Sequence, residues 1–371
     1  MRRVLLLGAT TAALSLGSCA LLVDTSGLVA TEADDGASPA EGSLVDQRLP
    51  SDAGPIIEAG ADANVPLPAS CQGAAGPGIS RCGPDGGENC CSSPMVAGGT
   101  FRRSFDGKVN VDGTHPATVS GFRLDRFETT VARFRRFVTA ASAGWKPSAG
   151  AGKHTHLPGG SLAMVGTAGA EPGWNTAWND RLASAPVQWS AELTCEAPQN
   201  TWTDQPGVNE AKAINCTTWY QAYAFCIWDE GFLPSEAEWN FAAAGGDEQR
   251  LFPWSKPPAD STIDCSYANY ADYDAATQCN SNVLIPGSFP KGDGRWSHAD
   301  LLGNVVEWTL DSYLDYVNPC VNGVNLLPAT YTSLRGGCFY GIPGSPYVSG
   351  RILDMPQRVS RGFGVRCARS P

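Results

Sequence analysis

The stretch Gly231-Phe-Leu-Pro-Ser-Glu-Ala-Glu-Trp239 contains the strongest local folding signal in the chain. Ser235, followed three residues later by Glu238, forms a capping box, in which the hydroxyl accepts from the third amide and the glutamate reaches back. A helix is therefore expected to begin at Ser235. Gly245-Gly246 predicts its end, because glycine tolerates the left-handed conformation that follows a helix.

Further elements are expected on both sides of this helix. Apolar alternation over residues 117–124 predicts a half-buried strand, and the helix that follows has apolar residues on one face. Another helix is expected to begin at Thr217 or Thr218, with an apolar stripe that includes Cys226. Residues 142–185 are rich in Gly, Ser and Ala and are predicted to form loops. Short strands are predicted around residues 284–289, 304–310 and 333–340. Helix and sheet without a βαβ period indicate the α+β class.

Composition limits the possible classes. The chain has 371 residues, with 42 Gly and 27 Pro, which argues against a coiled coil or a plain helical bundle. Length alone favours two domains. The formal net charge is −11, and residues 20–70 hold nine acidic residues against one basic residue, so most of the negative charge lies there. Nothing in this pattern forms the clustered basic surface that a nucleic-acid partner requires.

The N-terminus resembles an export signal. Arg2 and Arg3 precede an apolar run too short to span a bilayer, and Leu16-Gly17-Ser18-Cys19 resembles a bacterial lipobox. The resemblance implies cleavage after residue 18, lipidation of Cys19 and anchoring to the bacterial cell envelope. The outer membrane is the expected site, facing the periplasm or the surface, because Ala20 gives no inner-membrane retention signal. The alternative is an ordinary cleaved signal. The acidic segment 19–70 is predicted to be a disordered tether.

Cysteine content fits an exported protein. Without Cys19, twelve cysteines remain, which allows up to six disulfides. A zinc site is the competing interpretation, but the sequence contains no CxxC pair. Four cysteines fall within residues 71–91, and this segment is expected to form a small stapled knot at the entrance to the main domain.

Several motifs in order resemble one family. They are Pro186-Val187, Ile214 to Ala222, Phe225-Cys-Ile-Trp228, Gly231 to Trp239, Phe252-Pro-Trp254, Leu302-Gly-Asn-Val-Val-Glu-Trp308, Arg335-Gly-Gly337 and Gly362-Phe-Gly-Val-Arg-Cys367. This set is similar to the formylglycine-generating-enzyme (sulfatase-modifying factor) domain and spans about residues 92–371. The resemblance implies one large domain with little regular secondary structure, related in its core to C-type-lectin folds. It therefore argues against the two domains favoured by length.

The resemblance also implies specific residues. Cys226 and Cys367 match a disulfide of the family. Residues 300–307 resemble a calcium loop, in which the Asp300 side chain, the carbonyls of Gly303 and Val305 and the carboxylate of Glu307 bind the ion. Asn269 and the Tyr270 carbonyl match part of a second calcium site. Hard oxygen ligands suit a structural calcium ion. The alternative is that Asp300 and Glu307 only cap turns.

The copper centre of the family is missing from this sequence. Aerobic members hold Cu(I) between two cysteines about four and nine residues after the Gly-Gly pair, and soft thiolates suit that ion. Here the two positions hold Gly341 and Pro346, so copper is not expected. Cys338 is a weak catalytic candidate. A disulfide to Cys320 or Cys279 is the preferred interpretation of Cys338.

Histidine does not supply a replacement metal centre. The chain has four histidines, and His154-Thr155-His156 lies in a Gly-rich stretch, where we expect a solvated pair rather than a chelating one. No HxxxH or HExxH motif occurs. The G-x-S-x-G motif of one large class of serine hydrolases is also absent.

The sequence therefore favours a lipid-anchored protein that is not an oxidase and binds a peptide, glycan or protein partner. Its only membrane contact is expected through the lipid. The binding groove is predicted near Trp308, Cys338, Phe339 and Tyr340, because the resemblance places a peptide cleft there. The alternatives are an oxidoreductase that acts on a sulfur donor, converting a substrate cysteine to formylglycine, and an assembly factor of the envelope.

Overall fold

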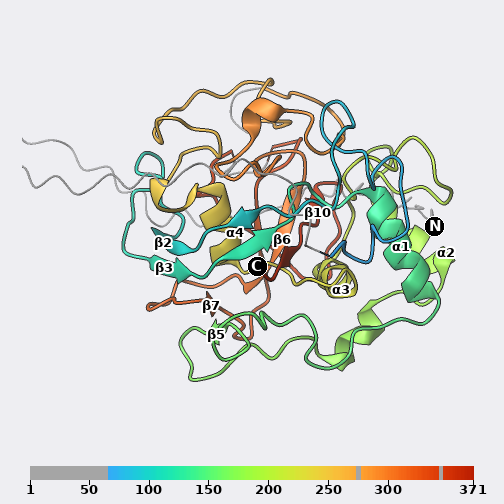
Figure 1. Cartoon of the computed structure of the whole chain (residues 1–371), viewed down its shortest axis with the longest axis horizontal. Coiled ribbons are helices and arrows are strands. Elements are labelled where there is room, and N and C mark those ends of the chain that lie inside the picture. The colour runs from blue at the N-terminus through green and yellow to red at the C-terminus, as the bar shows by residue number, and fades with distance from the viewer. Residues whose placement is uncertain (1–65, 273–276, 342–345) are drawn as a thin grey trace, which may run out of the picture.

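The computed structural model describes residues 66–272, 277–341 and 346–371. The predicted signal segment, Cys19 and most of the predicted tether lie outside this range. Regular elements are short (Figure 1), in the order β1 (Met95–Val96), β2 (Gly99–Arg102), β3 (Pro116–Val119), β4 (Phe122–Leu124), α1 (Val131–Ser142), β5 (Ala163–Met164), η1 (Thr176–Arg181), α2 (Pro186–Leu193), α3 (Trp219–Trp228), α4 (Glu236–Ala243), η2 (Gly246–Glu248), η3 (Pro290–Gly292), β6 (Val306–Ser312), β7 (Gly323–Val324), β8 (Thr332–Arg335), β9 (Ile352–Asp354), β10 (Phe363–Gly364) and β11 (Ala368–Arg369). The predicted α+β class is confirmed. Within the described part of the chain, no helix combines the length and apolarity needed to cross a membrane.

Local sequence determines where the helices begin. Thr130 caps α1 by accepting from Arg133 N, and Thr218 caps α3 in a capping box with Gln221. The predicted capping box of Ser235 and Glu238 opens α4. Gly245 follows α4 with φ +66°, in the left-handed region where glycine has no steric penalty.

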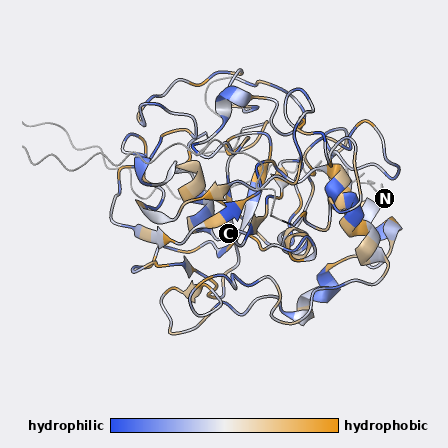
Figure 2. Ribbon diagram, in the orientation of Figure 1, coloured by the Kyte–Doolittle hydropathy of each residue, from blue (hydrophilic) through white to orange (hydrophobic). Residues whose placement is uncertain are grey.

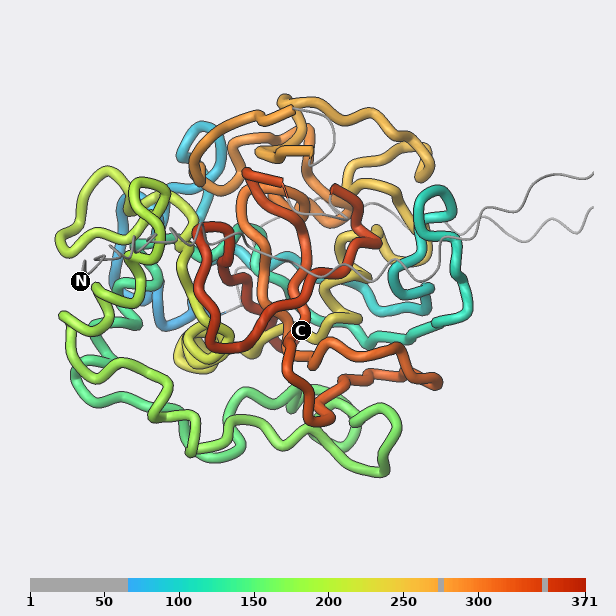
Figure 3. Tube along the Cα trace, turned by 180° about the vertical axis from the view of Figure 1, so that it is seen from behind, coloured from blue at the N-terminus to red at the C-terminus, as the bar shows by residue number. Residues whose placement is uncertain are grey.

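A four-stranded sheet has the order β10-β6-β8-β9, and its strands β6 and β10 lie near the centre of the molecule in Figure 1. The view from behind in Figure 3 shows the orange-to-red C-terminal part of the chain running through the middle of the molecule. β6 runs antiparallel to β8, with Trp308 opposite Leu334, and parallel to β10, with Val306 opposite Phe363. The strand predicted over residues 117–124 is instead two strands, β3 and β4, separated by Ser120-Gly121. Residues 284–289 form turns and irregular structure, so the strand predicted there was wrong.

Aromatic side chains fill the core between the helices. Phe134 and Phe137 of α1 pack on Phe225 of α3 and on Trp189 of α2, with ring centroids 5.3 to 6.3 Å apart. Figure 2 shows the corresponding alternation of apolar and polar positions along α1. The Phe134–Phe225 pair is stacked and the other three pairs meet edge to face, and both geometries are favourable beyond simple area burial. Helix α2, which the sequence did not predict, is therefore part of the core.

A buried ring of charges joins the entrance segment to the rest of the domain. Arg133 contacts Asp125 at 2.9 Å and Asp229 at 2.5 Å, while Arg369 contacts the same two aspartates at 2.9 and 2.7 Å. Ser70 donates from its amide to Asp229 and accepts from Arg133. The ring thus connects α1, the end of α3, the C-terminal strand and the start of the described chain.

Disulfide bonds confirm the expectation drawn from the cysteine content. Among the described residues, five pairs form: Cys71–Cys91, Cys82–Cys90, Cys195–Cys216, Cys226–Cys367 and Cys265–Cys279. The first two hold the entrance segment. The pair Cys226–Cys367, which the family resemblance implied, links α3 to the C-terminal segment.

Candidate functional site

The predicted groove around Trp308 and Cys338 is closed. Trp308, Cys338 and Phe339 have at most 1% of their surface exposed. Trp308 belongs to the main core and donates from its indole to Thr217 O, and Phe339 packs in a small cluster with Val305. Tyr340 is half-buried and shares a hydrogen bond with the Ser360 hydroxyl. Trp308, Cys338 and Phe339 are too deeply buried to contact a ligand in this structure, so three of the four residues predicted to line the groove do not line one, while Tyr340 keeps part of its surface exposed.

The two positions that hold copper ligands in the family hold residues without ligating side chains. Gly341 lies beyond the turn that follows β8, with φ +73°, and Pro346 resumes the described chain after residues 342–345. Neither side chain offers sulfur, nitrogen or oxygen to a metal. The residues present therefore do not fit a bis-cysteine Cu(I) centre.

Cys338 does not pair with either predicted cysteine. Cys279 is bonded to Cys265, and Cys320 is a buried thiol. Burial raises the pKa of the Cys320 thiol, which opposes formation of the thiolate. Both expected pairings of Cys338 were thus wrong.

The predicted calcium loop contains a ligand that is otherwise engaged. Both carboxylate oxygens of Glu307 contact Arg366, at 2.7 to 3.0 Å, and the Trp239 indole donates to Glu307 Oε2 at 2.6 Å. Asp300 accepts from Gly287 N at 2.5 Å. Burial, followed by the repulsion of Asp293 and Glu307, raises the pKa of Asp300 to about 6. The contacts of Glu307 weigh against its carboxylate as a calcium ligand, and calcium binding stays a prediction.

Part of the second predicted calcium site has an unsatisfied oxygen. Asn269 is fully buried, and its Oδ1 atom has no hydrogen-bond partner among the described residues. Its Nδ2 atom donates to Asn282 O and Asn304 Oδ1. The Tyr270 carbonyl accepts from Cys279 N at 2.9 Å. A bare buried amide oxygen is a suitable cation ligand, whereas the Tyr270 carbonyl already has a donor. No cluster of three or more His, Cys, Asp or Glu side chains able to hold a metal occurs among the described residues.

The histidine pair is not solvated as predicted. His154 is fully buried, with Nδ1 3.0 Å from Glu171 and Nε2 3.1 Å from Glu238. Burial alone would lower the pKa of His154, but the Glu238 charge and hydrogen bonds to both glutamates raise it to about 9. His156 is half-buried, and its ring stacks on Phe232 with centroids 5.5 Å apart. His154 is therefore a buried cation that holds the loop after α1 against the start of α4. The Gly-rich sequence around it did not indicate this burial.

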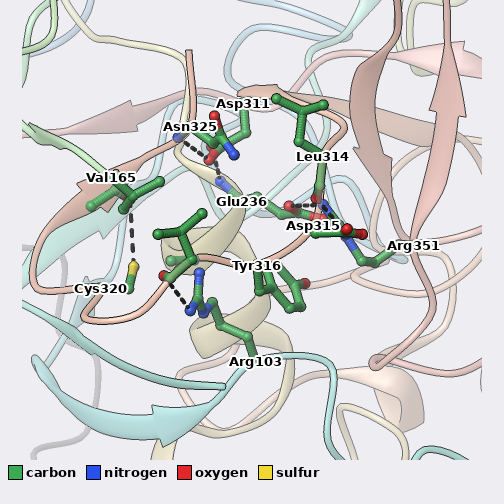
Figure 4. A pocket seen from close by; sticks show the side chains of 13 residues that line it. Arg103, Val165, Glu236, Asp311, Leu314, Asp315, Tyr316, Cys320, Asn325 and Arg351 are labelled. Atoms are coloured by element: carbon green, nitrogen blue, oxygen red, sulfur yellow. Dashed lines mark hydrogen bonds and ion pairs between the residues drawn. The ribbon is translucent and has the colours of Figure 1, made fainter. Parts of the chain in front are cut away.

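One pocket near the sheet is too small to hold a ligand. Figure 4 shows Glu236, Arg351 and Asp311 around it, and its volume is about 10 Å³, which is room for one water molecule. Arg351 binds Glu236 through two hydrogen bonds of 2.8 Å. These hydrogen bonds occupy the pocket, so its side chains contribute to the stability of the fold and not to ligand binding.

A much larger open groove lies on another face, and we call it the Tyr220 groove. Its volume is about 970 Å³, within the range of small-molecule sites. It is lined by Lys146, Asn179, Asp180, Arg181, Leu182, Ala183, Ser184, Gln188, Ala191, Glu192, Thr194, Cys195, Thr218, Tyr220, Gln357 and Val359. These residues come from η1, α2, the start of α3 and the segment that precedes β10. Of all the pockets described, only this one is both open and large enough for a ligand.

Hydrogen bonds hold several side chains of this groove in place. Lys146 Nζ donates to Leu182 O at 3.1 Å and to Ala183 O at 3.0 Å, and burial lowers its pKa. Glu192 Oε2 accepts from Gln221 Nε2 at 2.6 Å, and burial raises the pKa of the Glu192 carboxyl. The groove therefore presents polar side chains whose positions are largely fixed before any ligand arrives.

The sequence did not indicate this groove. Its residues are distributed over more than two hundred positions, and among the quoted motifs only Ile214 to Ala222 contributes lining residues, Thr218 and Tyr220. One signal in the sequence could have revealed part of the groove. Pro186 stands at the first position of α2, where proline is favoured, and would have predicted this helix, which lines the groove.

The comparisons with known proteins agree with one another. A family model described as "Sulfatase-modifying factor enzyme 1-like domain" matches residues 83–371. The formylglycine-generating enzyme of Thermomonospora curvata is 26% identical over 301 residues, covering 74% of this chain and 92% of the relative. The "Inactive C-alpha-formylglycine-generating enzyme 2" of Mus musculus is 26% identical over 295 residues, covering 74% and 84%.

Two further matches extend this picture. The serine/threonine-protein kinase Pkn1 of Chlamydia trachomatis serovar L2 is 28% identical over 284 residues, 74% of this chain, but the match spans only 38% of that relative's length. The solved structure of PvdO from Pseudomonas aeruginosa superposes with a TM-score of 0.50 at 18% identity, covering 80% of this chain and all of that one. At this identity the likeness shows a shared fold.

Proposed function

The chain belongs to the sulfatase-modifying factor family, and from this membership we propose that it is a non-oxidase member that binds a peptide, glycan or protein partner. The observation that carries the proposal is the pair Gly341 and Pro346 at the two copper positions. Without two thiolates, the domain lacks the soft ligands that Cu(I) requires. Because one fold can host many functions, the loss of the metal ligands leaves binding as the function to be argued from the surface of the domain.

Relatives named as inactive support this proposal. The proteins of Mus musculus and Bos taurus that match at 26% identity carry the name "Inactive C-alpha-formylglycine-generating enzyme 2". The family therefore includes proteins whose names exclude the enzyme activity. The relative from Thermomonospora curvata, at the same identity, is named as the enzyme, so overall identity does not separate the two groups. For this chain, the residues at the copper positions support the non-oxidase proposal.

The Tyr220 groove is the binding surface that we propose for the partner. Its volume and its pre-positioned polar side chains suit ligand binding better than the closed region around Trp308. Anchoring by a lipid on Cys19 is part of the same proposal and rests on the sequence Leu16-Gly17-Ser18-Cys19. Two acyl chains or more are sufficient for stable membrane attachment. The protein would then present its groove at the bacterial envelope.

A structural calcium ion remains part of the proposal. The buried carboxyls of Glu128, Asp300 and Glu307 face the single guanidinium of Arg366. Burial, then Asp300 and Glu307, raise the pKa of Glu128 well above its usual value. A divalent cation beside Glu128 and Asp300 would balance their charge, whereas both oxygens of Glu307 already contact Arg366. Calcium is then expected to raise the melting temperature of EDTA-treated protein, while magnesium has a smaller effect. An unchanged melting temperature with calcium would contradict the proposed calcium site.

Titration with Cu(I) tests the non-oxidase proposal. The exported protein and a Gly341→Cys/Pro346→Cys double variant are compared in competition with a colorimetric Cu(I) chelator. We expect no stoichiometric copper uptake by the native chain and a gain of affinity in the double variant. Tight binding of one Cu(I) by the native chain, abolished by Cys338→Ser, would instead support the oxidoreductase alternative.

A further inference from the structure

We propose that the Tyr220 groove binds a neutral oligosaccharide. The inference rests on the proposed function, because it names the class of ligand for the same groove. It is drawn from the shape of the groove, its aromatic wall, its balance of charge and the elements that line it.

The shape of the groove suits an extended ligand that remains partly in solvent. The groove is open to solvent, and its volume of about 970 Å³ lies at the upper end of the range of small-molecule sites, which leaves room for a ligand of several linked rings. It is not dominated by apolar side chains: Leu182, Ala183, Ala191 and Val359 are its only aliphatic lining residues. A ligand with many polar groups on its surface fits this composition.

Tyr220 provides a rigid aromatic wall. Its ring packs against Trp219, with centroids 5.3 Å apart, and against Trp178 at 6.0 Å. These two neighbours hold the ring in place, so little side-chain entropy is lost when a ligand packs on it. The C–H face of a pyranose ring is apolar, and a tyrosine offers it both contact area and a hydroxyl at the edge.

The polar side chains can both donate and accept hydrogen bonds. The lining of the groove includes the amides of Asn179, Gln188 and Gln357 and the carboxylates of Asp180 and Glu192. A sugar hydroxyl is at once a donor and an acceptor, so such a mixture satisfies it from both sides. Gln188 is further fixed by the Ser184 amide and hydroxyl, each 3.0 Å from its Oε1 atom. Its amide nitrogen is thereby oriented away from Ser184.

The charges in the groove cancel. Lys146 and Arg181 contribute two positive groups, and Asp180 and Glu192 contribute two negative ones. An ionic ligand gains affinity from a surface of opposite sign, which this arrangement does not offer. The balance therefore favours a neutral saccharide over a sulfated or uronic one.

The elements around the groove argue against an extended peptide. Peptides are commonly captured by adding a strand to an exposed sheet edge or by filling apolar pockets. The groove is lined by η1, α2, the first turn of α3 and irregular segments, and no strand of the described chain contributes a residue to it. Addition of a strand is therefore not available in this groove, and its four aliphatic side chains offer little area for apolar pockets.

The test is a binding experiment with defined probes on the full exported chain. Maltotetraose, cellotetraose and chitotetraose serve as neutral probes, oligogalacturonate as an anionic probe, and cysteine-containing peptides as the peptide probe. Titration calorimetry then measures the affinity of the chain for the neutral probe that binds best. We expect binding to a neutral probe, with an affinity that is unchanged between low and high salt because no ion pair forms.

Substitutions locate the binding in the groove. Tyr220→Ala and Glu192→Gln are each expected to lower the affinity for the best neutral probe by about tenfold or more, because each removes one good contact. Tyr220→Phe keeps the ring and should retain most of the affinity. Tyr331→Ala removes a half-buried tyrosine outside the groove and is the matched control. Circular dichroism confirms that each variant is folded.

The outcomes separate this inference from the proposed function. If no neutral probe binds, or if binding persists in folded Tyr220→Ala and Glu192→Gln variants, the inference is overturned. Peptide binding that these variants abolish would overturn the saccharide while leaving the binding function in place. Conversion of a peptide cysteine to an aldehyde would overturn the proposed function itself.

Discussion

His154 Nε2 lies 3.1 Å from Glu238 Oε2 in the fully buried interior, so the loop after α1 is tied electrostatically to the first turn of α4. Glu238 also closes the capping box that begins α4. The contact therefore couples a loop position to a helix start. Its strength depends on the charge of His154.

This pair predicts a loss of stability at alkaline pH. The pKa of His154 is raised to about 9 from about 6.5 in the unfolded chain, so its contribution is complete below about pH 6.5 and disappears as pH rises through 9. The shift corresponds to something on the order of 3 kcal/mol. The free energy of unfolding, measured by urea titration, should fall over this window.

The matched variants test this interpretation. His154→Gln should lower the stability at pH 6 and remove most of the change between pH 6.5 and 9. His115→Gln, on a half-buried histidine that contacts the exposed Asp112, should leave the profile intact. A profile that stays flat in the native protein would show that His154 is neutral.

The buried charge ring predicts a large cost when one member is removed. Asp229→Asn leaves Arg133 and Arg369 facing Asp125 alone, and breaking a buried pair in this way costs about 3 to 5 kcal/mol. Asp247→Asn removes an exposed partner of Arg295 and should change stability by about 0.5 kcal/mol or less. Thermal melts of both variants measure the two losses of stability. Equal losses would contradict the claim that the buried ring stabilises the fold more than an exposed ion pair does.

Disulfide removal should depend on the length of the closed loop. Cys226–Cys367 spans 141 residues and Cys265–Cys279 spans 14. In a chain-entropy account, their loss costs about 5 and about 3 kcal/mol respectively. Double Ser variants of each pair, compared by denaturant unfolding, should show the larger loss for Cys226→Ser/Cys367→Ser. The reverse order would indicate that native-state contacts dominate over loop entropy.

Lipid attachment predicts a simple labelling result. Cells that express the native chain with a labelled fatty acid should incorporate label into the protein and place it in the membrane fraction. Cys19→Ala should abolish both effects, because its side chain cannot form the thioether. Labelling that survives this substitution would assign the lipid elsewhere, and unlabelled native protein would favour an ordinary cleaved signal.

Local rules predicted the starts of α3 and α4, because Thr218 and Ser235 each satisfy amides within their own first turn. The family resemblance likewise implied the Cys226–Cys367 bridge. His154 could not be placed in this way: its partner Glu238 is 84 residues away, and only tertiary packing brings the two together. The Tyr220 groove escaped prediction for the same reason. The residues around Trp308 show a different limit: the family resemblance places a peptide cleft there, but the sequence does not reveal that Trp308, Cys338 and Phe339 are buried.

The most direct test of the account is a side-by-side oxidation assay. The native chain and the formylglycine-generating enzyme of Thermomonospora curvata are supplied with Cu(I), oxygen and cysteine-containing peptides, and mass spectrometry follows the peptide thiol. We predict that the enzyme converts the cysteine to formylglycine while this chain leaves it unchanged, because Gly341 and Pro346 cannot bind copper. Conversion of the peptide by this chain above the metal-only background would contradict the central claim.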